Sequence, residues 1–267
     1  MKQNKISRST VLLFLLGAAL IVAALIMLVP DLLNYKQSND TYEALKENYI
    51  SEKAENTEVA EETEGDDSWW YTDVDVKLEE LQQVNADIIG WIRFDNLEQL
   101  SYPVLYSGDD EKYLRTDIYG NQTIAGCIFM EGMNTPDFQD YHTILYGHNM
   151  KNGSIFGTLD SYKKADYWKE HPIVRFYVDG EPRTYEVFAA VETQVLYEDE
   201  DGFRYYRYDG DISEEEYDEL VTWLRGHSDY DTEIVPEYED QILMLSTCSY
   251  HTKNGRFVVA ARRVAEP

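Results

Sequence analysis

An uncharged run near the N-terminus, from Val11 to Val29, restricts the fold of this 267-residue chain more than any other feature. Nineteen residues in a helix are long enough to cross the hydrocarbon core of a bilayer. The run exceeds the usual apolar region of a cleaved signal peptide, and no small-x-small pair follows it before Pro30. We therefore expect a transmembrane anchor at residues 11–29. A cleaved signal peptide is the alternative, and it would change the tether but not the compartment.

The charges on the two sides of this run predict its orientation. Three basic residues and no acidic residue precede it, whereas acidic residues dominate the sequence after it. By the positive-inside rule we expect residues 1–10 to form a cytoplasmic tail and the rest of the chain to lie outside the cell. Residues 30–71 should form an acidic extracellular spacer, because the segment from 51 to 67 holds eight acids, one lysine and almost no apolar side chains. Residues 31–50 have mixed character and could be helical.

The net charge of −28 narrows the classes of partner. No basic patch is available to neutralise phosphates, so we exclude nucleic acid as a partner. The acidic cluster Glu198–Asp201 could attract cations, but it lacks the spacing of an EF-hand loop. We interpret it as a solvated loop.

Residues 72–267 suit one domain of mainly β structure. A helix is predicted at Val74–Val84, and a second, with a capping box formed by Ser213 and Glu216, should end at Gly226. The expected strands are short, apolar and separated by turn signals; they cover residues 88–94, 102–106, 125–130, 143–146, 173–178 and 183–195. The last two flank Asp-Gly-Glu-Pro and predict a hairpin. Such a pattern is typical of a barrel or a sandwich.

The stretch with the clearest chemistry lies close to the C-terminus, where two apolar segments flank a polar turn. Ile242–Leu245 is an unbroken apolar run, typical of a strand buried on both faces, and Phe257–Ala261 is apolar again. Residues 251–255 between them end in Asn-Gly, a strong turn signal. Such a hairpin places Cys248 beside Arg256, whose cation favours thiolate over thiol. The alternative is a small buried cysteine and a solvated arginine.

The second cysteine, Cys127, lies in the apolar run 124–130 and is expected to be a buried core residue. Outside the cytoplasm the two cysteines could form a disulfide. One lies in an apolar strand and the other at a strand end among polar residues, and these different contexts argue against that pairing.

A cysteine enzyme needs a proton carrier, and histidine most often has that role. Of the five histidines, His148 has the most site-like place, because it follows a predicted strand in Tyr-Gly-His-Asn-Met, where glycine lets the chain turn. The others open a strand, adjoin helix ends or lie in the C-terminal turn; they are His142, His171, His227 and His251. No second histidine or acid stands at metal-ligand spacing from His148, so we expect no zinc site.

Three motifs together resemble the signature of sortases, the cell-wall transpeptidases of Gram-positive bacteria. They are Leu245-Ser-Thr-Cys248, Arg256 eight residues further on, and Tyr146-Gly-His148-Asn-Met. The N-terminal anchor, the helix before the first strand, the serine before Thr-Cys and the long capped helix ahead of the cysteine strand are similar to class B. The resemblance covers residues 72–264. It implies that residues 72–267 are a catalytic domain, an eight-stranded sortase-type β-barrel with N-terminal helices.

The resemblance also implies roles for individual residues. By motif position Cys248 is the nucleophile, His148 the general acid and base, and Arg256 stabilises the transition state. The residues expected in the substrate groove are Ser246, Leu114, Tyr146 and Thr247. Asp110 stands where an asparagine is expected, four residues before Leu114, which leaves the recognised sorting motif open.

The implied reaction is a transpeptidation that needs no metal or organic cofactor. The cysteine cleaves after a threonine in the C-terminal sorting motif of a secreted protein, at the outer face of the cell membrane. The resulting thioester then passes to an amine of a peptidoglycan precursor, either lipid II or a cross-bridge. The alternatives are a pilin-polymerising sortase, another wall-associated cysteine hydrolase or L,D-transpeptidase-like enzyme, and a non-catalytic anchored binding module.

Overall fold

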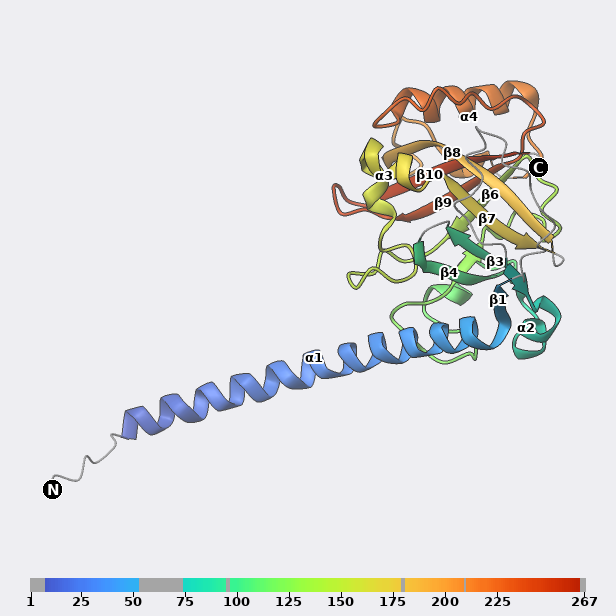
Figure 1. The fold of residues 1–267 in the computed structure, drawn as a ribbon. Helices are drawn as coiled ribbons and strands as arrows, with labels where there is room; N and C mark the ends of the chain where they lie inside the picture. The colour runs from blue at the N-terminus through green and yellow to red at the C-terminus, as the bar shows by residue number, and fades with distance from the viewer. Residues whose placement is uncertain (1–7, 53–73, 95–96, 179–180, 209, 265–267) are drawn as a thin grey trace.

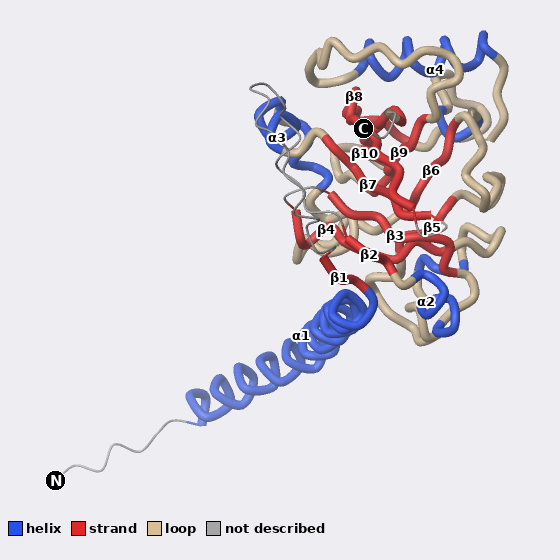
Figure 2. The backbone as a smooth tube through the Cα atoms, turned by 45° about the vertical axis from the view of Figure 1, so that its right-hand side comes forward, coloured by secondary structure: helices blue, strands red, loops and turns tan. Residues whose placement is uncertain are grey.

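Eight strands close into a β-barrel in the part of the chain that the structure describes (Figures 1 and 2). The computed structural model describes residues 8–52, 74–94, 97–178, 181–208 and 210–264. The barrel strands are β3 (Ile88–Phe94), β4 (Leu97–Leu105), β5 (Ile128–Met130), β6 (His142–Tyr146), β7 (Ile173–Val178), β8 (Glu181–Gln194), β9 (Ile242–Cys248) and β10 (Gly255–Arg263). Around the barrel they follow the order β10-β8-β7-β3-β4-β5-β6-β9. The expected eight-stranded, mainly β fold is confirmed.

Two parallel strand pairs determine which loops meet at the barrel rim. β4 pairs with β5 and β6 with β9 in parallel, while the other neighbouring strands are antiparallel. In the β6–β9 pair Tyr146 lies opposite Ser246. Parallel strands point the same way, so the residues that follow β6 and β9 emerge side by side. His148 lies two residues after Tyr146, and Cys248 lies two residues after Ser246.

The unbroken apolar run of β9 is explained by burial on both faces, as its sequence predicts. Leu243 and Leu245 belong to the larger buried cluster, which fills the barrel. Ile242 and Met244, on the opposite face of the strand, belong to a second cluster with α4 (Glu214–His227). Successive side chains of a strand point to opposite faces, so a strand covered by a helix on the outside is apolar at every position.

Helix α4 forms as its capping box predicts. The Ser213 hydroxyl accepts a hydrogen bond from the Glu216 amide at 3.3 Å, and the Glu216 carboxylate accepts one from the Ser213 amide at 2.9 Å. Its buried face consists of four residues at helical spacing, Tyr217, Leu220, Val221 and Leu224. The helix ends at His227 rather than at Gly226, one residue later than expected.

The remaining described elements are short, apart from the N-terminal helix α1 (Arg8–Tyr49). They are β1 (Ile50–Glu52), β2 (Val74–Val76), α2 (Leu78–Val84) and α3 (Ala165–Glu170), with the 3₁₀ helices η2 (Lys112–Leu114), η3 (Leu159–Lys163) and η4 (Tyr205–Arg207). β1 and β2 form a separate two-stranded antiparallel sheet.

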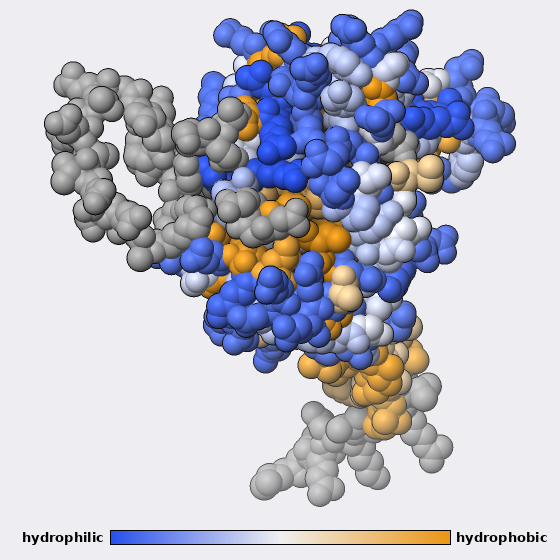
Figure 3. All heavy atoms as spheres, turned by 90° about the vertical axis from the view of Figure 1, so that its right-hand side faces the viewer, coloured by the Kyte–Doolittle hydropathy of each residue, from blue (hydrophilic) through white to orange (hydrophobic). Residues whose placement is uncertain are grey.

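Helix α1 is long and apolar enough to cross a membrane, and its apolar part is not buried against the domain. It projects away from the barrel in Figure 1, and Figure 3 shows its apolar surface next to the mostly polar surface of the domain. The helix continues through Pro30 to Tyr49. A helix that could be an anchor is therefore present where the sequence predicts it.

The first part of the spacer expected over residues 30–71 is helical and packs on the barrel. Residues 30–49 continue helix α1, and Tyr42 and Leu45 are buried in the main cluster. The Tyr42 hydroxyl donates to the Gly126 carbonyl at 2.8 Å, and its ring meets the Tyr102 ring edge to face. This segment therefore packs on the barrel because two of its apolar side chains have a partner surface there. The acidic segment 53–73 lies outside the described residues.

Two predicted elements are shorter than expected. The helix predicted at Val74–Val84 begins only at Leu78, because Val74–Val76 pairs with β1 as a strand. The strand predicted at residues 125–130 is reduced to Ile128–Met130. Gly126 has a φ of +59°, and a Cβ there would lie 2.4 Å from the Tyr113 carbonyl oxygen, so the chain turns tightly at this glycine.

Candidate active site

The β9–β10 hairpin brings the conspicuous cysteine and arginine together. Arg256 is the direct partner of Cys248 in the antiparallel register. The turn between them is tight: Asn254 has a φ of +58°, and a Cβ on Gly255 would lie 2.5 Å from the Ser249 carbonyl oxygen. The Arg256 side chain is partly buried, and its Nη1 donates to the Gly255 carbonyl at 3.0 Å. The predicted neighbourhood of thiol and guanidinium is confirmed.

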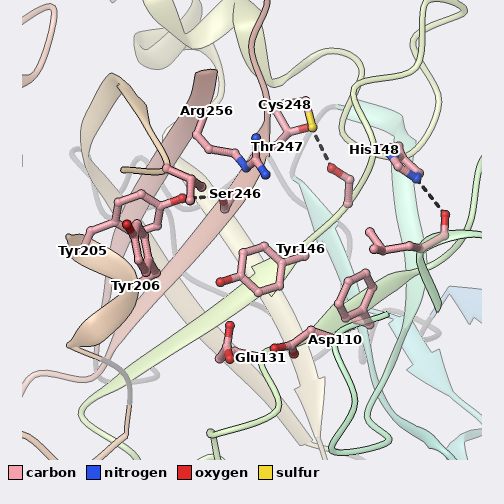
Figure 4. A pocket seen from close by; sticks show the side chains of 14 residues that line it. Asp110, Glu131, Tyr146, His148, Tyr205, Tyr206, Ser246, Thr247, Cys248 and Arg256 are labelled. Atoms are coloured by element: carbon pink, nitrogen blue, oxygen red, sulfur yellow. Dashed lines mark hydrogen bonds between the residues drawn. The ribbon is translucent and has the colours of Figure 1, made fainter. Parts of the chain in front are cut away.

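The β6–β9 pairing brings the predicted histidine to the same place. Beyond the last strand pair, the Gly147 amide donates to the Ser246 carbonyl at 3.2 Å, and the Thr247 hydroxyl donates to the Gly147 carbonyl at 2.7 Å. These bonds continue the pairing up to His148 and Cys248. In Figure 4 Cys248 lies between Arg256 and His148.

The three residues line one pocket of about 380 Å³. All seven residues that the sequence assigns to catalysis or substrate binding lie on its wall: Cys248, His148, Arg256, Ser246, Leu114, Tyr146 and Thr247. They come from three separate parts of the sequence: η2, β6 with the loop after it, and the β9–β10 hairpin. The pocket has both a candidate nucleophile and space beside it for a peptide, as an enzyme site requires.

His148 is held by a backbone carbonyl rather than by a carboxylate. Its Nε2 lies 2.7 Å from the Leu114 carbonyl oxygen. A carbonyl only accepts, so Nε2 carries the hydrogen and Nδ1 carries the lone pair of the neutral ring. Burial lowers the pKa of His148; the Leu114 hydrogen bond opposes this shift, while the nearby Arg115 and Arg256 cations add to it. The neutral imidazole is thus favoured.

The wall of the pocket away from Cys248 is acidic and aromatic. Burial raises the pKa of Tyr146, and the carboxylate of Glu131 beside its hydroxyl raises it further. Asp110 accepts a hydrogen bond from the Gly132 amide at 2.7 Å through Oδ1. Figure 4 shows both carboxylates on the same side of the pocket as the Tyr146 ring. A substrate residue in this part of the pocket meets negative charge.

Tyr205, in the 3₁₀ helix η4 ahead of α4, lines the pocket next to Ser246. The Tyr205 hydroxyl lies 2.9 Å from the Ser246 hydroxyl, and burial raises the pKa of Tyr205 to about 12. The next residue, Tyr206, lines the pocket as well, whereas Trp223 stacks on Phe203 in the cluster under α4.

Some lining residues were not assigned from the sequence, above all Glu131. It is buried and directly follows the apolar strand β5, so a carboxylate at a strand end was the available signal. Phe129 and Val195 also line the pocket. They look like ordinary core residues in the sequence, and no local pattern separates them from the rest.

Cys127 is a buried free thiol outside the pocket, as expected. Burial raises its pKa to about 12, and its Sγ contacts the Thr116 carbonyl oxygen at 3.3 Å. Cys248 is also a free thiol and is partly exposed. A thiol with a raised pKa is a poor nucleophile at neutral pH, so Cys127 suits packing rather than chemistry.

The other four histidines do not line the pocket. His142 is fully buried at the start of β6, and His227 bonds the Trp223 carbonyl of its own helix. His251 lies in the β9–β10 turn, 2.8 Å from the Ser249 hydroxyl, and His171 packs on an aromatic ring after α3. Among the described residues, no group of three or more His, Cys, Asp or Glu side chains could hold a metal ion.

Comparison with known proteins gives one consistent family. A family model described as the sortase domain matches residues 93–264. The chain is 30% identical over 193 residues to sortase B of Listeria monocytogenes serovar 1/2a, which covers 71% of this chain and 75% of that protein. The structure of sortase B from Bacillus anthracis in complex with AAEK1 matches with a TM-score of 0.68 at 28% identity, over 88% of this chain and 100% of that chain. The Staphylococcus aureus sortase B–substrate complex matches with a TM-score of 0.63 at 28% identity, over 71% of this chain and 85% of that chain.

Proposed function

This chain belongs to the sortase family, as a class B member, and we propose that it cleaves a sorting motif after threonine through a Cys248 thioester and transfers the acyl group to a cell-wall amine. One observation carries the assignment of roles. The parallel β6–β9 pairing and the β9–β10 register bring His148 and Arg256 to the two sides of Cys248 in a single pocket.

The first half-reaction forms the thioester. The neutral ring of His148 first accepts the Cys248 thiol proton at Nδ1, which gives the thiolate and the imidazolium. The thiolate attacks the threonine carbonyl carbon, and the carbonyl π electrons move to oxygen to give a tetrahedral oxyanion. The Arg256 guanidinium donates hydrogen bonds to that oxyanion. As the carbon–nitrogen bond breaks, His148 in its imidazolium form gives a proton to the leaving amine. The products are the thioester, a free amine and neutral His148.

The second half-reaction uses the same groups in reverse. The incoming primary amine attacks the thioester carbonyl, and the neutral ring of His148 accepts its proton. The Cys248 thiolate leaves, and an amide bond joins the threonine to the acceptor. The hydrogen bond from Nε2 to the Leu114 carbonyl fixes the tautomer in which Nδ1 is the base.

The proposed place of this reaction is the outer face of the cell membrane, with helix α1 as the anchor. Its support is the length and apolar surface of α1 together with the basic residues ahead of it. Protease added to intact protoplasts should degrade the domain and leave about the first dozen residues and the span protected. A domain that stays intact while an exported control protein is degraded contradicts both the orientation and the substrate class.

Turnover with defined peptides and amines tests the proposed reaction. We expect the full-length protein in detergent to join the acyl part of at least one peptide from a library of sorting peptides to a cell-wall amine. Release of the free acid alone would indicate a hydrolase, and joining of two stem peptides an L,D-transpeptidase-like enzyme. Cys248→Ala should be inactive and Cys127→Ala active. Absence of any product, with Cys248 resistant to a thiol probe, would favour a binding module.

A further inference from the structure

Two side-chain hydrogen bonds join the loop after β6, which we call the β6 loop, to the end of β9. They lie on the two sides of His148, the proposed acid–base residue. On one side of His148, the Thr247 hydroxyl donates to the Gly147 carbonyl at 2.7 Å. On the other side, Asn149 Nδ2 donates to the Cys248 carbonyl at 2.9 Å. Each bond joins a neighbour of His148 to the segment that carries the cysteine.

We infer that Asn149 is a positioning residue for the transfer reaction, which fixes His148 relative to Cys248 through its bond to the Cys248 carbonyl. The inference rests on the proposed function, because it assumes that these two residues exchange protons with the same substrate. Asn149 itself does not line the pocket, so it acts through its neighbours and not on the substrate.

The orientation of the Asn149 amide is determined by its two acceptors. Nδ2 has two hydrogens, and besides the Cys248 carbonyl it donates to Asp160 Oδ2 at 3.2 Å. The reversed amide would place its oxygen against two acceptors and lose both bonds. Asp160 in turn lies near Lys163, with Oδ1 3.9 Å from Nζ.

The same lysine is linked through Glu192 to Ser249, the residue after the cysteine. Lys163 Nζ lies 2.6 Å from Glu192 Oε1, and the Ser249 hydroxyl donates to that oxygen at 3.3 Å. A hydrogen bond to Lys163 lowers the pKa of Glu192, so this pair stays ionised near neutral pH. We call the closed set of side chains around the end of β9 the polar clamp; its members are Asn149, Asp160, Lys163, Glu192 and Ser249.

The polar clamp fixes Cys248 and Ser249, the two residues after Thr247. Its members come from three elements: η3, β8 and the β6 loop. Proton transfer to a leaving amine depends on the distance and direction between donor and leaving group, and a misplacement of about 1 Å can cost on the order of 10²-fold in rate. Thiolate attack on a substrate with a good leaving group needs no such proton. Loss of the bond between Asn149 and the Cys248 carbonyl should therefore slow acylation by a peptide, whose leaving amine needs a proton, more than acylation by a substrate with a good leaving group.

Single-turnover acylation of the full-length protein in detergent tests this difference. Two donors share one acyl part ending in threonine: a peptide, whose leaving amine needs a proton, and a thioester, whose leaving thiolate does not. For Asn149→Ala we expect the rate of acylation by the peptide to fall by roughly 10- to 100-fold relative to the wild type. The peptide concentration at half-saturation should stay within about threefold of the wild-type value. The rate of acylation by the thioester should also stay within about threefold of the wild-type rate. Asn152→Ala is the matched control, because Asn152 lies in the same loop but bonds Ser154 and Asn39 instead.

Equal losses with both donors, or no loss with either, would overturn the inference. If Asn149→Ala does not fold, Asp160→Ala serves for the same comparison, since it removes the second acceptor of the Asn149 amide. We expect the rate of acylation by the peptide alone to fall by about 3- to 10-fold. Equal losses with the peptide and the thioester would overturn the inference. Failure of the proposed function is separate. It would show as acylation of the Cys248→Ala variant, whatever the result for Asn149.

Discussion

Between pH 7 and pH 5 the free energy of unfolding should fall by about 2 kcal/mol because of one buried imidazole, that of His142. The ring is completely buried at the start of β6; Nδ1 bonds the Tyr208 carbonyl at 2.8 Å, and Nε2 has no hydrogen-bond partner among the described residues. Burial lowers the pKa of His142 from 6.5 to about 4. Between these two values the unfolded chain binds a proton that the folded chain does not, so stability is lost as the pH falls. The full loss, below pH 4, is about 3 kcal/mol.

Urea unfolding of the full-length protein in detergent at pH 5, 6, 7 and 8 measures this loss. In His142→Asn the amide can replace Nδ1 as the donor to the Tyr208 carbonyl, but it does not titrate. The variant should lose about 2 kcal/mol less than the wild type between pH 7 and pH 5, whatever its stability at pH 8. His227→Asn, at an exposed helix end, is the control and should follow the wild type. Parallel pH dependences for the wild type and His142→Asn would refute the assignment of a buried neutral ring.

Three further predictions concern the site and its surroundings. Arg256→Lys should lower the rate of acylation by roughly 10²–10³-fold and leave its pH profile in place, because lysine keeps the charge but not the planar donors. Arg262→Lys is the control and should not change the rate, because Arg262 lies on the same strand but pairs with carboxylates outside the pocket. Arg115→Gln removes a cation that lowers the pKa of His148, so the His148 limb of the pH–rate profile should move to higher pH, and an unmoved or downward-shifted limb contradicts this. Cys127→Ala should reduce the free energy of unfolding by about 1–2 kcal/mol in urea titration and leave acylation unchanged; an inactive but folded variant would reverse the roles of the cysteines.

The local parts of the fold could be predicted because their signals are local. The strand Ile88–Phe94 and the strand Ile173–Val178 have the predicted bounds. The Asn-Gly turn placed Arg256 opposite Cys248, and the capping box marked the start of α4. In each case a few adjacent residues determine backbone conformation by their own chemistry.

The parts that failed depend on partners distant in the sequence. Nothing near Tyr42 indicates that its hydroxyl bonds Gly126, so the contact of residues 30–49 with the barrel was not predicted. The strand Val74–Val76 depends on β1, from which an acidic segment separates it. The parallel β6–β9 pair joins residues about one hundred positions apart, and no local pattern in the sequence indicates it.

The same distinction holds within the site. Cys248, His148 and Arg256 belong to short motifs, whereas Glu131 and Asn149 become relevant only when strands meet. The β5–β6 pairing brings Glu131 next to the Tyr146 hydroxyl, and no residue spacing in the sequence predicts that contact.

Identification of the acylated residue tests the central claim most directly. The full-length protein is incubated with sorting peptides, quenched in acid, digested and analysed by mass spectrometry. We predict an adduct on the fragment that contains Cys248, with the mass of the peptide's acyl part through threonine, which a cell-wall amine discharges. Product formation with Cys248 unmodified throughout, or with the adduct on Cys127, would contradict the account.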